Sequence, residues 1–170
     1  MTLPASAGSG ASGGPLDGQL ALLRSAGDDA TARGLEHDIL ASFRHSGSPS
    51  ADLILTRATI ADSTGDHDTA LRLANTLVQL APGFAEGWRL SATILREKGD
   101  RSGAMAALHK AVALNPRHFA ALAELAELCA ISGDGAAAQM YYRQVQVLDP
   151  RFSGIAERIA QVARLAHPSK

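Results

Sequence analysis

The 170-residue sequence predicts an all-α protein, an α-solenoid built from antiparallel helix pairs. From Leu16 onward, apolar residues recur at helical spacing, and no stretch alternates with the period of two that marks a strand. Glycine, proline and alanine columns repeat every 34 residues, which indicates one structural unit used several times. Aromatic residues make up only 4% of the chain and much of the apolar content is alanine, so the helices are expected to pack closely.

The N-terminal quarter falls outside the repeat. Residues 1–15 are mostly Ala, Gly, Ser, Thr and Pro, which cannot bury enough apolar surface to offset the entropy of ordering, and they predict a flexible tail. Residues 16–50 predict a divergent helical pair. Its first helix stops near Gly27, and Asp28 or Asp29 caps the second. We expect this pair to close the N-terminal end of the array.

Three repeats follow, over residues 51–84, 85–118 and 119–152. Within each repeat a glycine is followed by an aspartate, which is typical of a helix end and a new helix start. A proline near the end of the repeat cannot continue the second helix. The recurring columns are Gly65, Gly99 and Gly133, then Pro82, Pro116 and Pro150, with alanines at 58, 92 and 126 and at 70, 104 and 138.

These columns resemble the tetratricopeptide repeat (TPR), a 34-residue helix–turn–helix unit. The middle repeat fits best, with Trp88, Ala92, Gly99, Ala104 and Pro116 at the family's marked positions. The resemblance is to small bacterial TPR proteins with three repeats, and it implies a right-handed solenoid. Residues 153–167 predict the C-terminal cap helix, with Ser153 as N-cap and an apolar stripe of Ile155, Ile159, Val162 and Leu165.

Charge and composition argue against several classes of protein. Lys and Arg total 16 and Asp and Glu total 17, without the basic excess of a nucleic-acid binder. No apolar run is long enough to insert into a membrane. The N-terminus lacks the features of a signal peptide, so we expect a cytoplasmic protein, or a periplasmic one if an upstream leader has been removed.

No motif in the sequence predicts catalysis, a cofactor or a metal. The six histidines include no pair four residues apart, and no carboxylate pattern completes a ligand set. Phosphate-loop and nucleophile motifs are also absent. We expect His118 to be solvated or to cap a helix, and the single cysteine, Cys129, to be a buried core residue.

The resemblance implies a non-catalytic scaffold that binds a peptide or helix of a partner protein in a concave groove lined by the first helix of each repeat. The partner's identity does not follow from the sequence, and the alternative is a self-assembling homo-oligomer. The candidate groove residues are Thr56, Thr59, Asp62, Arg89, Thr93, Arg96, Glu124, Glu127 and Arg158.

Two further observations bear on this groove. The middle repeat carries 6 basic and 3 acidic residues, whereas each neighbouring repeat carries 2 and 4, so Arg89 and Arg96 face Glu124 and Glu127. These charges either bind a partner or pair with one another. The carboxylate clamp of chaperone-binding TPR proteins is not matched, which argues against a partner tail of the EEVD type; its places hold Leu55, Thr59, Leu90, Ala120 and Glu124.

Overall fold

A computed structural model describes residues 14–166, and every regular element in that range is a helix. The all-α prediction is confirmed. The helices are α1 (Pro15–Arg24), α2 (Asp29–Phe43), α3 (Pro49–Ser63), α4 (His67–Leu80), α5 (Ala85–Glu97), α6 (Arg101–Leu114), α7 (Phe119–Ile131), α8 (Gly135–Leu148) and α9 (Ile155–Ala166). None of these helices has the length and apolar content needed to cross a membrane.

The turns inside the three repeats have the geometry that their glycines predict. Gly65, Gly99 and Gly133 adopt φ angles of 81°, 84° and 85°, a left-handed conformation that only glycine adopts at little cost. The aspartate after each glycine is the N-cap of the next helix, and its carboxylate accepts a backbone N–H three residues further on. The sequence therefore sets these helix boundaries locally.

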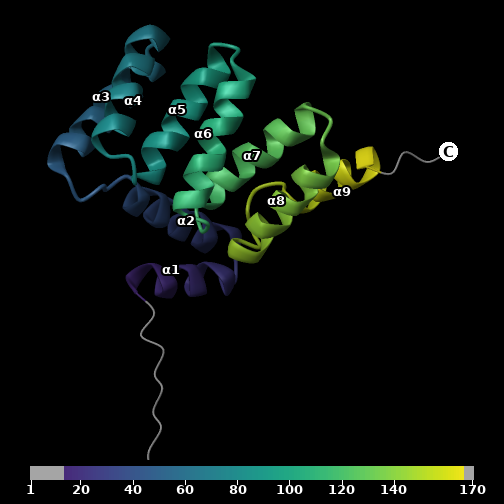
Figure 1. The fold of residues 1–170 in the computed structure, drawn as a ribbon. Coiled ribbons are helices and arrows are strands. Elements are labelled where there is room, and N and C mark those ends of the chain that lie inside the picture. The colour runs from purple at the N-terminus through teal and green to yellow at the C-terminus, as the bar shows by residue number, and fades with distance from the viewer. Residues whose placement is uncertain (1–13, 167–170) are drawn as a thin grey trace, which may run out of the picture.

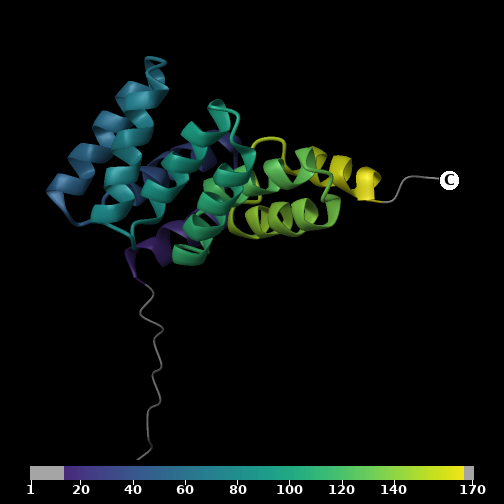
Figure 2. The ribbon, with the colours of Figure 1, turned by 45° about the horizontal axis from the view of Figure 1, so that its top comes forward.

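Helices α3 to α8 form three antiparallel pairs that stack side by side (Figures 1 and 2). Each pair packs on the next through α4 with α5 and through α6 with α7, and α9 covers α8. The repeating alanines are buried where these helices meet; Ala58, Ala70, Ala104, Ala126 and Ala138 are fully buried and Ala92 is nearly so. Small side chains allow this close approach, and the α-solenoid prediction is confirmed.

The N-terminal helices form where the sequence predicts them, but they do not close the N-terminal end of the array. Helix α1 packs on α2 and contacts α8, and in Figure 1 the two helices run beneath the stacked pairs. They lie along the segments that follow α4, α6 and α8, residues 81–84, 115–118 and 149–154, which we call the joint edge. The first turn of α1 starts at Pro15, which the sequence analysis placed in the tail; residues 1–13 lie outside the described residues.

Specific contacts hold α1 and α2 against the joint edge. The Arg151 guanidinium donates to the carbonyl oxygens of Ala26 and Gly27 and to Asp29 at 2.7–2.9 Å. The ring of Phe43 lies 4.6 Å from that of His118. Leu20, Leu23, Ala32 and Ile39 join one buried cluster with residues of α5 to α9, whereas α3, α4 and part of α5 form a second cluster.

The apolar surfaces that α1 and α2 could cover explain why the predicted position of these two helices is wrong. The outer face of α3 carries Arg57 between Leu53 and Ile60, and the two apolar side chains are 51% and 56% exposed. The start of α7, next to the joint edge, instead offers the ring of Phe119, which is fully buried and lies beside Phe43. Helical periodicity shows that α1 and α2 each have an apolar face, but it does not say which surface that face covers.

The cap helix α9 packs as expected, with one difference at its start. Ile155 and Val162 are buried and Ile159 is half-buried, in agreement with the predicted stripe; the side chain of Leu165 lies outside the described residues. Ser153 is not the N-cap, because α9 begins at Ile155 and the preceding residue is Gly154, with φ 69°. The chain needs a left-handed residue to turn from the joint edge into α9, and Gly154 provides it.

Candidate groove of the repeat array

The candidate groove residues lie on α3, α5, α7 and α9, the first helices of the repeats and the cap. The structure brings several of them together and leaves others apart. On α3, the hydroxyls of Thr56 and Thr59 donate to backbone carbonyls one turn earlier in the helix and contact no other candidate residue. The remaining members fall into a central ion-pair network, a pair beside it, a hollow at the cap end and a cluster at the first repeat.

Arg89 is the centre of the ion-pair network. Its guanidinium donates to both carboxylate oxygens of Glu86, at 2.7 and 2.8 Å, and to Glu124 on the next repeat at 2.6 Å. The Thr93 hydroxyl contacts the other Glu124 oxygen at 3.3 Å. These carboxylates raise the pKa of Arg89, although burial acts against its charge. Arg89 therefore joins two repeats and has little freedom to bind a partner.

Glu86 is the most buried of the three charged residues in this network, with 4% of its surface exposed. Burial alone would raise its pKa, but hydrogen bonds and charge from Arg89 and His118 outweigh burial and lower the pKa to about 2. Glu86 consequently stays ionised at neutral pH. Although Glu86 lies on the same helix as the candidate groove residues Arg89, Thr93 and Arg96, its carboxylate is satisfied inside the protein.

His118 has two structural roles in the joint edge: it caps α7, and it contacts Glu86 and Phe43. It is fully buried, so a solvated role is wrong, but the predicted capping role is confirmed: its side chain accepts the N–H of Ala121 at the start of α7. The other ring nitrogen, Nε2, lies 2.9 Å from Glu86, and the ring lies against Phe43. Asn-Pro-Arg-His at 115–118 is thus a structural joint. Cys129 is buried, as predicted.

Arg96 and Glu127 form the second pair between repeats. Arg96 Nη1 lies 3.6 Å from Glu127 Oε2, and both side chains are substantially exposed, at 39% and 45%. A solvated pair at this distance contributes little to stability. Unlike Arg89, Arg96 and Glu127 can break their ion pair and bind charged groups of a partner protein at a small cost in stability.

The cap end of the array carries a hollow of about 270 Å³ between α7, α8 and α9. Its lining combines apolar and charged groups, namely Glu127, Ala130, Ile131, Tyr142, Arg158, Gln161 and Val162. Ile131 is 55% exposed at its rim. The Arg158 guanidinium lies 6.0 Å from the centre of the Tyr142 ring, and it forms no ion pair with the part of the chain that the structure describes.

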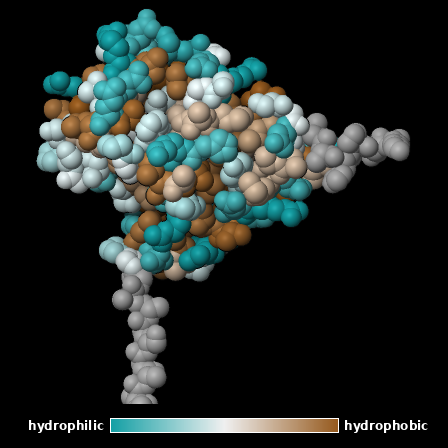
Figure 3. Space-filling view, in the orientation of Figure 1, coloured by the Kyte–Doolittle hydropathy of each residue, from teal (hydrophilic) through white to brown (hydrophobic). Residues whose placement is uncertain are grey.

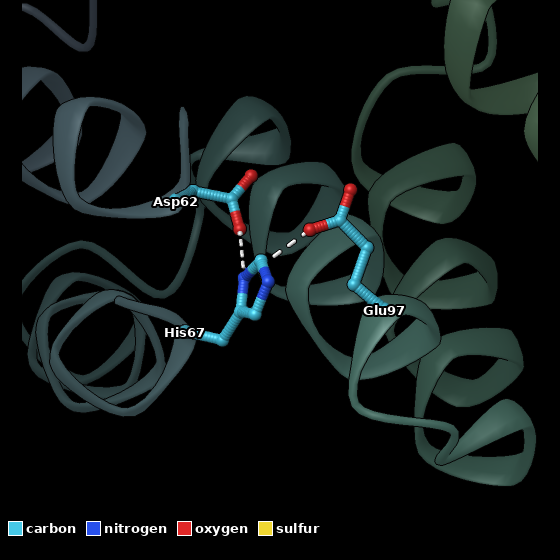
Figure 4. Close-up of side chains that lie close together, drawn as sticks. All are labelled: Asp62, His67 and Glu97. Carbon is cyan, nitrogen blue, oxygen red and sulfur yellow. Dashed lines mark hydrogen bonds and ion pairs between the residues drawn. The ribbon is translucent and has the colours of Figure 1, made fainter. Parts of the chain in front are cut away.

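A cluster that the sequence analysis missed lies at the other end of the groove. Asp62 comes together with His67 and Glu97, and their ligand atoms all lie within 4.8 Å of one another (Figure 4). No histidine pair or contiguous motif marks this set, because its members are spread over three helices. The 34-residue register could have found it, since the end of one first helix lies beside the end of the next.

Comparison with known proteins supports the fold. No protein-family model matches the chain. A TPR repeat-containing protein of Rhizobium etli is 28% identical over 119 residues, which is 70% of this chain and 58% of the relative. The chain therefore spans little more than half the length of this curated relative.

Solved structures agree over most of the array. The MamA protein matches with a TM-score of 0.64 and 18% identity, over 89% of this chain and 82% of MamA. The first TPR of Spaghetti (RPAP3), bound to the HSP90 peptide SRMEEVD, matches with a TM-score of 0.65 and 16% identity, over 68% and 92%. The Yersinia enterocolitica chaperone SycD, in complex with a YopD peptide, matches at 0.59 and 14%, over 69% and 90%. The stacked pairs of this chain have the tetratricopeptide-repeat fold, as their 34-residue register predicts.

Proposed function

We propose that the chain is a non-catalytic scaffold that binds a segment of a partner protein in the groove of its repeats, at the cap end. The hollow between α7, α8 and α9 carries the proposal. It places the Arg158 guanidinium next to the exposed Ile131 side chain and the Tyr142 ring. An acidic side chain of a partner would pair with Arg158. An apolar side chain close to it in the partner's chain would pack on Ile131 and Tyr142.

Similar folds with bound peptides support this class of function. The Spaghetti domain holds an HSP90 peptide, a Sti1 domain is described as a complex with Hsp70, and SycD holds a YopD peptide. This chain differs from a clamp for acidic tails. Leu55 and Leu90 are buried at clamp positions, and Glu124 already accepts from Arg89. The partner segment is therefore expected to differ from an EEVD tail.

Affinity capture with quantitative mass spectrometry tests the proposal. The intact chain would be the bait beside Arg158→Glu, Ile131→Glu and a control, Lys110→Glu, which reverses an exposed charge on α6 outside the groove. We expect a protein that is retained by the wild-type and Lys110→Glu baits and is depleted about tenfold or more by the two groove variants. Circular dichroism would verify that all four chains are folded.

The same set of proteins on all four baits would contradict a binding site at the cap end. Loss from every variant, the control included, would point to general charge effects and would equally count against the proposal. Partner binding and folding are measured separately, so a variant that unfolds is not scored as a binding loss.

One observation favours the alternative, a self-assembling module. The outer face of α3 exposes Leu53 and Ile60, and no helix packs on it within residues 14–166. An exposed apolar face at the end of a repeat array is where a second copy would stack. Light scattering at high concentration separates the two functions: self-association that Ile60→Glu abolishes would favour assembly, and a monomer would favour the scaffold.

A further inference from the structure

We propose that Asp62, His67 and Glu97 form a binding site for Zn²⁺ or another divalent transition-metal ion that accepts nitrogen and oxygen ligands. The three side chains come from three helix ends. Asp62 lies in the last turn of α3, His67 is the first residue of α4, and Glu97 is the last residue of α5. All three point toward one another in Figure 4.

The distances from His67 to the two carboxylates fit a metal's ligand shell. His67 Nδ1 lies 3.1 Å from Asp62 Oδ1 and 3.3 Å from Glu97 Oε2. Ligands held about 2.05 Å from a tetrahedral zinc ion are about 3.3 Å apart. A hydrogen bond accounts for one of these contacts but not for both, because Nδ1 carries at most one hydrogen and an N–H donates well to a single acceptor.

The charge around the cluster also favours a cation. Two carboxylates face a single imidazole, and a divalent ion would neutralise them. Lys98, the nearest lysine in sequence, pairs with Asp68. The carboxyl ends of α3 and α5 add the partial negative charge of their helix dipoles, while the amino end of α4 acts in the opposite sense through one helix only.

The repeat provides an internal comparison. The equivalent positions one repeat further along the chain hold Arg96, Arg101 and Ile131, none of which is a metal ligand. Repeat packing therefore does not require a His and two carboxylates at this place. The cluster is confined to the contact between the first and second repeats, where α3, α4 and part of α5 share one buried apolar cluster. A bound ion would join α3 and α4 to α5 there.

The ligand types narrow the choice of metal. One imidazole and two carboxylates suit zinc and its neighbours, whereas calcium takes six to eight oxygen ligands and magnesium a near-ideal octahedron of them. Three protein ligands leave a fourth position of a tetrahedral ion to water, and solvent can reach it because His67 is 34% and Glu97 40% exposed. An exchangeable ion is expected.

Titration of the intact, metal-free chain tests this site. Zn²⁺ would be followed by calorimetry and Co²⁺ by visible absorption, whose intensity distinguishes a four-coordinate ion. We expect one ion per chain, a rise in the melting temperature with Zn²⁺, and no such rise with Mg²⁺ or Ca²⁺. His67→Gln and Glu97→Gln should each weaken binding about tenfold or more.

A matched control uses a histidine outside the cluster. His37 is exposed on α2, and His37→Gln should bind Zn²⁺ as the wild type does. Two results would overturn the site: no binding by the wild-type chain at about 0.1 mM Zn²⁺, or equal affinity of the His67→Gln and His37→Gln variants. Glu97→Gln alters an exposed helix end, so it keeps the test valid even where His67→Gln affects folding.

Discussion

At the scale of single residues, the groove separates side chains that hold the array together from those that are free to bind. Arg89 and Arg96 lie seven residues apart on α5 and appear equivalent in the sequence. The structure gives Arg89 two carboxylate partners at 2.6–2.8 Å and Arg96 one at 3.6 Å. Arg89 has a partner on its own helix, Glu86, and a second on the next repeat, Glu124, whereas Arg96 pairs only across the repeats, with Glu127.

This difference predicts unequal effects of truncation. Arg89→Ala leaves the buried Glu86 carboxylate with His118 alone and should lower the free energy of unfolding by about 2–3 kcal/mol. Arg96→Ala breaks an exposed pair and should cost less than about 1 kcal/mol. Urea denaturation of both variants checks the prediction, and equal losses would show that the Arg89 network is not structural.

A second residue-scale feature is a pair of carboxyl groups between α2 and the joint edge. Burial and the neighbouring Asp149 carboxyl raise the pKa of Glu36 to about 7, and burial also raises the pKa of Asp149. One Asp149 oxygen is buried without a hydrogen-bond partner. A hollow beside this pair is lined by Asp29, Arg33, Glu36 and Arg151. The positive charge of Arg33 lowers the pKa of Glu36, but it only partly offsets the rise.

The raised pKa predicts how stability depends on pH. In the unfolded chain Glu36 loses its proton near pH 4.5, whereas in the folded chain it keeps the proton until about pH 7. The protonated pair is therefore favourable below pH 4.5, and this contribution is lost as the pH rises to 7. Glu36→Gln should flatten the decline in melting temperature across that range; an unchanged pH profile would contradict the raised pKa of Glu36.

At the scale of elements, the helix boundaries could be predicted and the position of one pair could not. Gly99 and Asp100 define a helix end and a helix start by their own backbone and side chain, so local sequence suffices. Helices α1 and α2 have no repeat register that would fix their place. Phe43 is separated from Phe119 by more than 70 residues, and the rings meet because α2 packs beside the start of α7.

The position of α2 predicts a local effect of Phe43. Phe43→Ala removes its contacts with the His118 and Phe119 rings and should destabilise the protein by about 2–3 kcal/mol. Backbone amides of residues 29–43 should then exchange hydrogen faster, while those of α3 and α4, in the other buried cluster, remain protected.

Leu22→Ala is the control for this variant, because Leu22 is 58% exposed on α1 and its loss should cost less than about 0.5 kcal/mol. Faster exchange throughout α3 to α9 in the Phe43 variant would mean that α1 and α2 are an integral part of one cooperative unit. Faster exchange confined to α1 and α2 would support their attachment as a separate layer.

At the scale of the whole molecule, a 34-residue register predicted the solenoid because every repeat uses the same contacts. The same regularity explains what the register left out. Features that occur once, such as the Asp62–His67–Glu97 cluster and the cap-end hollow, are not among the residues that recur every 34 positions, and they depend on how particular side chains meet across repeats. The pairing of the charges at Arg89 and Glu124 was one of two interpretations that the sequence left open, and the structure decides in favour of pairing.

The proposed partner binding therefore rests on the few positions where the repeat pattern is broken. Arg158 and Ile131 line the cap-end hollow, at the C-terminal end of the array, and remain available to a partner protein. The outer helices α4 and α6 face away from that hollow and carry none of its lining residues.

Hydrogen exchange of the intact chain, measured with and without its captured partner protein, tests binding at the cap-end hollow most directly. The proposal predicts that amides of residues 119–131 and 155–164 gain protection in the complex, while those of α4 and α6 do not change. Protection gained on α4 and α6, or along α1 and α2, with none on α7 and α9, would contradict it.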